Sequence, residues 1–302
     1  MATVADKLPE QAPSKVRAVS WAAVAWFGLL LIAAYLPILI KLVAQWSTDD
    51  DVSHGFFVPL VAGYIAWQRR ETLLRTEWKP AWWGIGILVW AGFQAYLGLL
   101  GAELFLQRSA FLFALLGLLL ILGGTQVVRQ LAFPLLLLPF MIPLPAVIYN
   151  QITFPLQLFA SAVAERSLEL LNVPVIRDGN ILELASQKLS VAEACSGIRS
   201  LLSLSFLSLV YAYFFDRKVW MRWVLLIATI PVAIIANSAR VTLTGVFSEI
   251  NPALAEGFFH EAEGFIIFAV ALVMMVIVHL ILSWVYRRFH HEPSLPKEQN
   301  LA

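Results

Sequence analysis

Long apolar runs recur along this sequence of 302 residues, and they constrain its fold more than any other feature. The runs are about 20 residues long, which is the length of an α-helix that crosses a hydrocarbon core ~30 Å thick. Hydrophobic residues make up 60% of the chain and charged residues only 14%, and a soluble domain of this length could not bury that much apolar surface. The pattern therefore predicts an all-α polytopic membrane protein.

About eight transmembrane helices are expected. The second candidate span is short, which indicates a tilted or partly interfacial helix, and the fifth contains four prolines, which predict a kink or a break. The spans lie in one domain over residues 19–288, flanked by tails at 1–18 and 289–302. In chain order the candidate spans are 19–40, 54–68, 82–100, 109–124, 131–150, 196–214, 220–239 and 264–286.

The distribution of basic residues predicts the orientation. Eight spans place both termini on one side of the membrane. If that side is the cytoplasm, 14 lysines and arginines fall on it and 7 on the other side, as the positive-inside rule requires. We therefore expect a multi-pass protein of the cytoplasmic (inner) membrane with both termini inside. Membrane lipid is an expected partner, and a net charge of +1 gives no indication of nucleic acid.

The segment between spans five and six is predicted to lie at the outer surface. In residues 151–172 one face carries Leu156, Phe159, Val163 and Leu170, which favours an interfacial amphipathic helix. The sequence Asp178–Gly179–Asn180 then stands between short alternating apolar runs, which predicts a small β-hairpin.

Three chemically active groups fall at the predicted outer face. The chain has one cysteine, Cys195, and it stands where span six begins. Arg240 stands at the outer end of span seven and His260 just before span eight. A thiol, a guanidinium and an imidazole are the groups needed for acyl transfer through a thioester.

Neighbouring residues would support this chemistry. A helix N-terminus at Cys195 favours a thiolate, and Arg199 at i+4 adds positive potential. Ser196 and Gly197 allow close approach of another backbone. Further candidate supporting residues are Glu193 and Asn237.

The thiol, the guanidinium and the imidazole can each also be explained without a catalytic role. A lone membrane cysteine is often a packing residue, an arginine at a span end often extends its head to the interface, and a loop histidine is often solvated. The same reasoning assigns no functional role to His279. It makes Glu193, Glu261 and Glu263 surface charges, unless Glu261 or Glu263 orients His260, and it leaves Asn237 a capping or pairing role. The residues alone do not decide between these readings.

Five stretches resemble the exosortase/archaeosortase family over roughly residues 20–288. They are "SHGFFVP" at 53–59, "GNILEL", "EACSGIRS", "NSARV" and "HEAEGFIIF". The resemblance implies a membrane cysteine peptidase or transpeptidase with no metal and no cofactor. It implies that Cys195 is the nucleophile and that Arg240 and His260 complete the site. Ser53, His54 and Gly55 would then be on the substrate side.

The resemblance also implies the partners. These are exported proteins whose C-terminal signal has a motif such as Pro-Glu-Pro, one transmembrane helix and a basic cluster. The final acyl acceptor is unknown. The rival hypotheses are a transporter, or a scaffold of an envelope polysaccharide assembly system. A transporter favours polar groups at mid-membrane and internal repeats, neither of which the sequence has.

Overall fold

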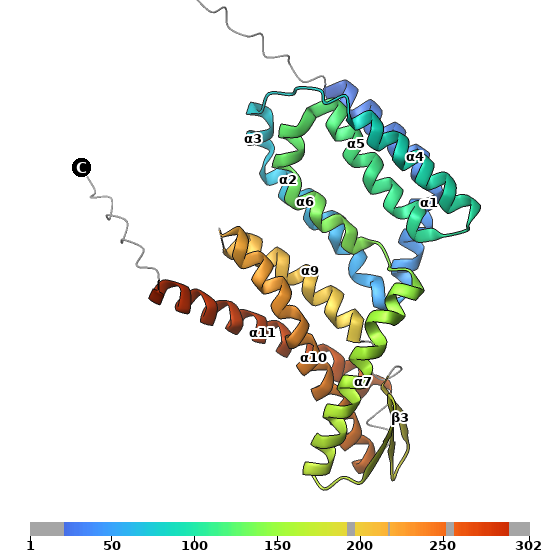
Figure 1. Ribbon diagram of the computed structural model, residues 1–302, viewed down its shortest axis with the longest axis vertical. Helices are drawn as coiled ribbons and strands as arrows, with labels where there is room; N and C mark the ends of the chain where they lie inside the picture. Colours follow the sequence, from blue (N-terminus) through green and yellow to red (C-terminus); the bar gives the residue numbers. More distant parts are fainter. Residues whose placement is uncertain (1–20, 192–196, 217, 252–256, 290–302) are drawn as a thin grey trace, which may run out of the picture. The chain divides into compact units, whose positions relative to one another are not determined.

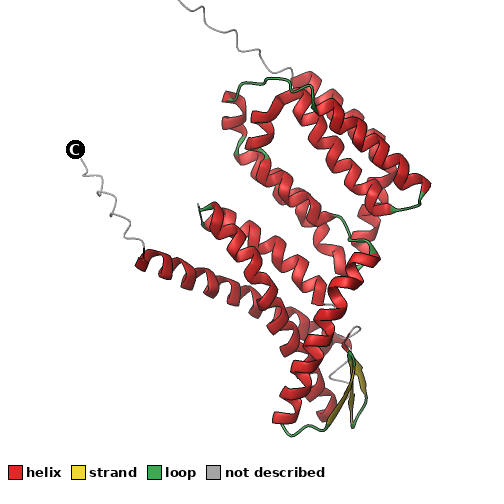
Figure 2. Cartoon of the chain, in the orientation of Figure 1, coloured by secondary structure: helices red, strands yellow, loops and turns green. Residues whose placement is uncertain are grey.

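The computed structural model describes residues 21–191, 197–216, 218–251 and 257–289 (Figure 1). For 197–200 and 257–262 it describes the backbone alone. The described chain is helical apart from one small sheet (Figure 2). It forms two compact units: unit 1 contains 21–45 and 55–142, and unit 2 contains 46–54 and 143–289.

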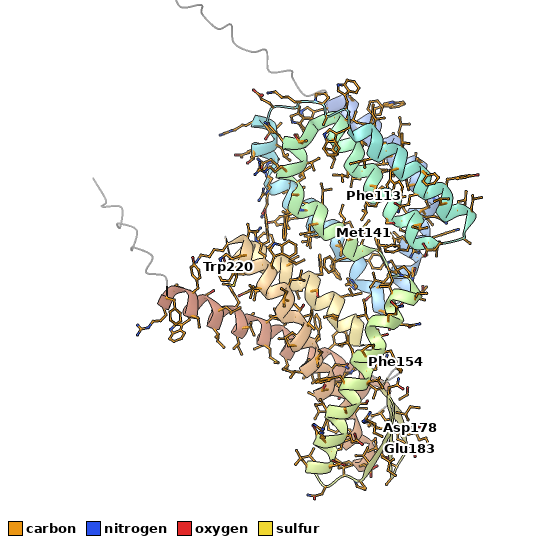
Figure 3. All side chains as sticks on the ribbon, in the orientation of Figure 1. Phe113, Met141, Phe154, Asp178, Glu183 and Trp220 are labelled. Carbon is orange, nitrogen blue, oxygen red and sulfur yellow. The ribbon has the colours of Figure 1, made fainter. Side chains whose placement is uncertain are left out.

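Unit 1 is built around a pair of antiparallel helices, α4 and α5. The two helices approach closely because Gly84 faces Gly117, and a Cβ atom on Gly84 would lie 2.8 Å from the Gly117 carbonyl oxygen. Helix α1 packs beside them through an edge-to-face contact of Tyr35 with Phe111. Phe113 in α5 and Met141 in η2 are labelled in Figure 3. The elements are α1 (Trp21–Thr48), α2 (Phe57–Gln68), α3 (Arg70–Arg75), α4 (Gly84–Leu100), α5 (Leu104–Gln130), α6 (Ala132–Leu137) and η2 (Leu138–Met141).

In its described residues, unit 2 contains four α-helices, most of the 3-10 helix η1 and the sheet. Helices α9, α10 and α11 share an apolar core of Leu204, Leu225, Ala233, Ala271 and Met275. Helix α7 packs against α10 (Figure 1). The elements are η1 (Asp50–Phe56), which begins in this unit, α7 (Ala146–Leu170), β1 (Val175–Asp178), β2 (Ile181–Leu184), β3 (Lys188–Ser190), α9 (Gly197–Phe215), α10 (Val219–Ile250) and α11 (Gly257–Phe289).

The sheet confirms the predicted hairpin and adds a third strand. Strands β1, β2 and β3 are antiparallel in that order. Asp178 pairs with Ile181 across a two-residue loop, and Gly179 in this loop has a φ of +62°. Glycine adopts a positive φ without steric cost, so the Asp-Gly-Asn sequence fits the turn. Asp178 and Glu183 lie on the sheet beside α7 (Figure 3).

The sheet is fixed to both α7 and α10. Its inward side chains pack in one cluster with Ala160, Ala164 and Leu168 of α7 and Val241 of α10. At one end of the sheet, the hydroxyl of Ser161 on α7 donates to the Gly179 carbonyl at 2.9 Å. At the other end, the Ser186 backbone N–H donates to the carboxylate of Glu249 on α10, also at 2.9 Å. The sheet therefore holds β3 at a defined position beside α10.

The prediction of eight spans is not confirmed. Among the described residues four helices are long and apolar enough to cross a membrane: α1, α5, α10 and the part of α11 from Glu263 onward. A fifth is reached if the bent pair α6–η2 and α7 is one span. Helix α2 has only 12 residues, or ~18 Å at 1.5 Å per residue, which is too short for the hydrocarbon core.

The fifth run is broken, as its prolines predict. Helix α7 begins at Ala146 rather than at residue 151, and the preceding helical segment ends at Met141. The face of α7 that packs inside the protein contains small residues such as Ala160 and Ala164. Phe159 and Leu170, on the predicted apolar face, are exposed. The predicted apolar stripe is therefore divided, because Leu156 lines a recess with residues of α9 and α10 while Phe159 and Leu170 face outward.

Candidate functional site

Arg240 lies well inside a helix rather than at its end. The sequence prediction ended this span at residue 239, but α10 continues for ten residues beyond Arg240, to Ile250. The polar side chains in this last part of α10 form hydrogen bonds within unit 2, which stabilises the helix beyond Arg240. For example, Thr244 and Ser248 are buried and hydrogen-bonded. Arg240 itself is half-buried, so its guanidinium is held against the protein rather than extended into solvent.

The guanidinium of Arg240 lies directly on α11. A Cβ atom added to Gly264 would lie 3.1 Å from Nη2 and 3.2 Å from Cζ of Arg240. A side chain at residue 264 would require the guanidinium to move by a few tenths of an ångström. Gly264 is one helical turn after residue 260, so α11 brings the backbone of His260 to the same end of the helix pair as Arg240.

A buried carboxylate adjoins this contact. Glu263 on α11 is only 6% exposed. The hydroxyl of Thr244 on α10 lies 2.9 Å from one Glu263 carboxylate oxygen and 3.1 Å from the other. The sequence interpretation of Glu263 as a surface charge is therefore wrong.

The start of α9 lies level with this part of α10. The two helices are antiparallel, and the hydroxyl of Ser205 lies 3.1 Å from that of Thr229. Gly197 is eight residues before Ser205, and Asn237 is eight residues after Thr229, so these two residues lie at about the same height along the helix pair. Measured along the axis of α10, the start of α9 thus lies about one helical turn from Arg240.

The end of the sheet reaches the same level. Val191, which follows β3, is completely buried in the cluster that contains Val241, the residue after Arg240. Its backbone N–H donates to the Asn180 carbonyl at 2.9 Å, and the Asn180 side chain donates to Gln157 on α7 at 3.0 Å. Val191 and Gly197, the described residues on either side of 192–196, therefore both belong to segments that pack beside α10.

The predicted site residues are described to different extents. Cys195, Glu193 and Ser196 lie outside the described residues. Gly197 is the first residue of α9, Arg199 lies in its first turn, and His260 lies in the first turn of α11, with only the backbone described for each. His260 was expected just before its helix and is inside it.

Asn237 is buried, and it lines a small recess with Leu156 of α7, Leu201 of α9 and Ala233 of α10. It therefore faces the junction of three helices, one turn before Arg240.

The early motif lies in η1. The hydroxyl of Ser53 donates to the Asp50 carbonyl at 3.0 Å, and His54 is half-buried. The segment is tied to the first turn of α7 because the Tyr149 hydroxyl donates to the Asp51 carboxylate at 2.7 Å. Gly55 belongs to unit 1. The substrate-side role of these residues stays a prediction.

A family model decides the relationship of the chain to known proteins. The model described as transmembrane exosortase matches residues 46–277, about three quarters of the sequence. The chain belongs to the transmembrane exosortase family. The match extends from the last turn of α1 into α11 and includes every predicted site residue. No curated protein and no solved structure matches the chain.

This exosortase also has a buried polar cluster at the other end of the α9–α11 bundle. Nε2 of His279 lies 3.2 Å from the Asp216 carboxylate, and Nδ1 lies 2.9 Å from the Tyr211 hydroxyl. The backbone N–H of Lys218 donates to the second Asp216 oxygen at 2.7 Å. Sequence reasoning treated His279 as unremarkable, because its partner Asp216 is 63 residues away in the chain.

Proposed function

We propose that this exosortase is a cysteine endopeptidase and transpeptidase of the cytoplasmic membrane. It would cleave C-terminal sorting signals of exported proteins at the outer membrane–water interface, through a thioester at Cys195. One observation carries the proposal: the Arg240 guanidinium lies against the end of α11 that contains His260. The start of α9, which Cys195 precedes by two residues, lies one turn from Arg240 along α10.

The short connection between Cys195 and the first residue of α9 supports the proposed position of the nucleophile. Two residues of extended chain span at most ~7 Å, which limits how far the Cys195 Cα can lie from the Gly197 Cα. Gly197 is level with Asn237, one turn before Arg240 on α10, so this limit supports the proposed action of the thiol beside Arg240. A nucleophile just before a helix also gains the field of the helix N-terminus, which favours its thiolate form.

The proposed reaction has two balanced steps. In the first, the Cys195 thiolate bonds to the carbonyl carbon of the scissile peptide. The C–N bond breaks, and His260 gives a proton to the leaving amine. Arg240 donates hydrogen bonds to the oxygen that becomes negative in the tetrahedral intermediate. In the second, an acceptor amine or water attacks the thioester, His260 takes its proton, and the thiolate leaves.

The proposed substrates fit the predicted orientation. An exported protein that ends in a motif, one transmembrane helix and a basic cluster keeps the basic residues in the cytoplasm. Its motif then lies at the outer interface, where the proposed site would face. Burial beneath the sheet and α7 would limit water and favour an amine acceptor over hydrolysis.

The test uses a reporter protein fused to a Pro-Glu-Pro motif, a transmembrane helix and a basic tail, co-expressed with each variant. Intact mass and gel mobility measure processing. We expect Cys195→Ala, Cys195→Ser and His260→Ala to abolish processing. Arg240→Lys should also abolish it, because a point charge does not replace a planar set of donors. Arg199→Ala should have a milder effect.

The matched control is Arg166→Lys, the same substitution at an exposed arginine on α7. It should process the reporter at the wild-type rate. Processing by Cys195→Ala would overturn the proposal and favour the non-catalytic alternative, a transporter or a scaffold of an envelope polysaccharide assembly system.

A further inference from the structure

Unit 1 contains an apolar cavity between the α4–α5 pair and the segment α6–η2. Its volume is about 580 Å³. Helix α5 lines it from Phe105 to Leu116, which corresponds to ~16 Å along the helix, and Phe113 on this wall is labelled in Figure 3. Trp90 of α4 and Leu138 of η2 belong to the other walls. Because α5 is long and apolar enough to cross a membrane, a cavity along it would open towards lipid rather than water.

A buried amide interrupts the apolar wall of this cavity. Gln94 of α4 is only 7% exposed, and it lines the cavity together with Ser109 of α5. Its Nε2 donates to the Leu106 carbonyl at 3.1 Å and to the Ser109 hydroxyl at 2.7 Å. A backbone carbonyl can only accept, so these bonds determine which end of the amide is the nitrogen. Both amide protons then have an acceptor.

The amide oxygen of Gln94 is in a different position. The Ser109 hydroxyl donates its single proton to the Phe105 carbonyl at 2.7 Å, so it is not available to Gln94. Within the described part of the chain, no group donates a hydrogen bond to Oε1 of Gln94. A buried amide oxygen without a donor is costly, and hydrocarbon supplies no water to bind it. The oxygen therefore favours a ligand that brings a hydrogen-bond donor into an otherwise apolar cavity.

The volume of the cavity distinguishes between a helix and a single chain. A helix ~10 Å across that filled the same ~16 Å would occupy ~1,200 Å³, about twice the volume that the cavity has. A flexible apolar chain fits this space without displacing the walls. Gln94 is six residues before the end of α4 at Leu100, or ~9 Å along the helix. The donor would therefore lie close to one end of the chain, near the end of the helix pair.

We propose that this cavity binds a membrane lipid that has an apolar chain and a neutral hydroxyl group. The hydroxyl donates to Oε1 of Gln94, and the chain lies along α5 towards Leu116. A neutral donor fits better than an ammonium group, because a charge within an apolar wall is expensive. The inference does not depend on the proposed function, and it assigns the lipid no part in the reaction.

The experiment uses the full chain in phosphatidylcholine nanodiscs and two photoreactive probes. One probe is hexadecanol with a diazirine at the middle of its chain, and the other is the methyl ether of the same alcohol, which lacks the hydroxyl proton. Intact mass measures the extent of labelling, and peptide mass mapping locates the label. We expect saturable labelling of the cavity walls around Leu116 and Leu138. The alcohol should reach half-saturation at a concentration about threefold to tenfold lower than the ether.

Two matched substitutions test the role of the amide. Gln94→Met keeps the length of the side chain and removes the oxygen, so the two probes should label this variant equally well. Gln107→Met is the control, because Gln107 is also buried and also donates to a backbone carbonyl, that of Gly98 at 2.8 Å, but does not line the cavity. It should keep the wild-type preference for the alcohol. The readout is a ratio on one preparation, so a smaller amount of folded protein does not change it.

A third variant tests the site itself. Leu138→Trp adds a large side chain to the η2 wall and should abolish saturable labelling by both probes. Wild-type labelling of this variant, or a label outside the cavity, would overturn the site. Equal half-saturation of the two probes in the wild type would overturn the recognition of a hydroxyl. A cavity that is labelled only after a dimer has been dissociated would mean that a second copy of the chain covers it, and would overturn the lipid.

The same variants keep this inference separate from the proposed function. Labelling is measured without substrate, and Cys195→Ala should show the wild-type preference for the alcohol. Processing of the reporter by Cys195→Ala would overturn the proposed function and leave the lipid site in place. A wild-type enzyme that processes the reporter but shows no saturable labelling of the cavity would have the opposite meaning.

Discussion

Gly264→Ala should separate the activity of this exosortase from its stability. Gly264 lies inside α11, where an alanine favours the helix by up to about 1 kcal/mol over glycine. The added Cβ atom would lie 3.1 Å from Nη2 and 3.2 Å from Cζ of Arg240. Carbon contacts are most favourable at about 3.5–4.0 Å, so the guanidinium has to move by roughly 0.5 Å.

The guanidinium is the far end of a flexible side chain, so this movement costs little free energy of folding. The thermal midpoint of Gly264→Ala in detergent should therefore equal or exceed that of the wild type. Catalysis is more sensitive to position, since a displacement of 1 Å can cost about 100-fold in rate. A shift of about half that size should lower kcat by roughly threefold to tenfold.

The assay is reporter processing at saturating substrate, with the thermal midpoint measured on the same preparation. The matched control is Gly92→Ala in α4, where a Cβ atom meets nothing within 4 Å. This variant gains the same helical preference and should keep the wild-type kcat. A Gly264→Ala enzyme that processes the reporter at the wild-type rate would refute the inference that the guanidinium acts from its position over Gly264.

Three further predictions concern the rest of the fold. His279→Phe removes the partner of Asp216 and Tyr211, so the free energy of unfolding should fall by about 1–3 kcal/mol. Reporter processing per folded molecule should stay at the wild-type level. A loss of kcat would contradict the assignment of this cluster to stability. Gly179→Val should cost about 1–2 kcal/mol from the positive φ alone, because its Cβ atom would meet nothing within 4 Å. If the sheet also guides substrate, processing should fall more than the amount of folded protein; equal losses would indicate a purely structural role. Reporter fusions after residues 102 and 180 should be active outside, and fusions after 75, 218 and 292 inside; an exterior C-terminus would contradict the predicted orientation.

Local signals in the sequence predict the local structure of the outer segment. The turn at Asp178–Gly179–Asn180 is confirmed because two residues determine its backbone, and one of them is a glycine with a positive φ. The break before α7 follows from prolines in the same way. In both cases the residue that causes the feature is in the segment that shows it.

The ends of the helices were harder to predict from the sequence. An apolar run ends where polar residues begin, but the helix can continue beyond that point. Span seven was expected to end at residue 239 because of Arg240, yet α10 continues to Ile250. Its later polar side chains are bonded to partners distant in the sequence, such as Ser186 and Glu263. A single sequence does not give the register between α10 and α11, so neither the burial of Glu263 nor its contact with Thr244 was foreseen.

The polar residues of unit 2 have a spacing that bears on the proposed substrate. Glu263 and His279 are both buried on α11, 16 residues apart, which corresponds to ~24 Å along a helix. Between them the bundle core is mainly apolar, with Ala271 and Met275 in it, apart from the buried hydroxyl pair of Ser205 and Thr229. A hydrocarbon core is ~30 Å thick, so the separation of the two clusters is slightly less than the thickness of such a core. A sorting signal has the same arrangement, with a polar motif, an apolar helix and a basic end. A substrate helix aligned with α11 would therefore bring its motif to Arg240 by matching the length of its own apolar part, without any polar contact inside the membrane.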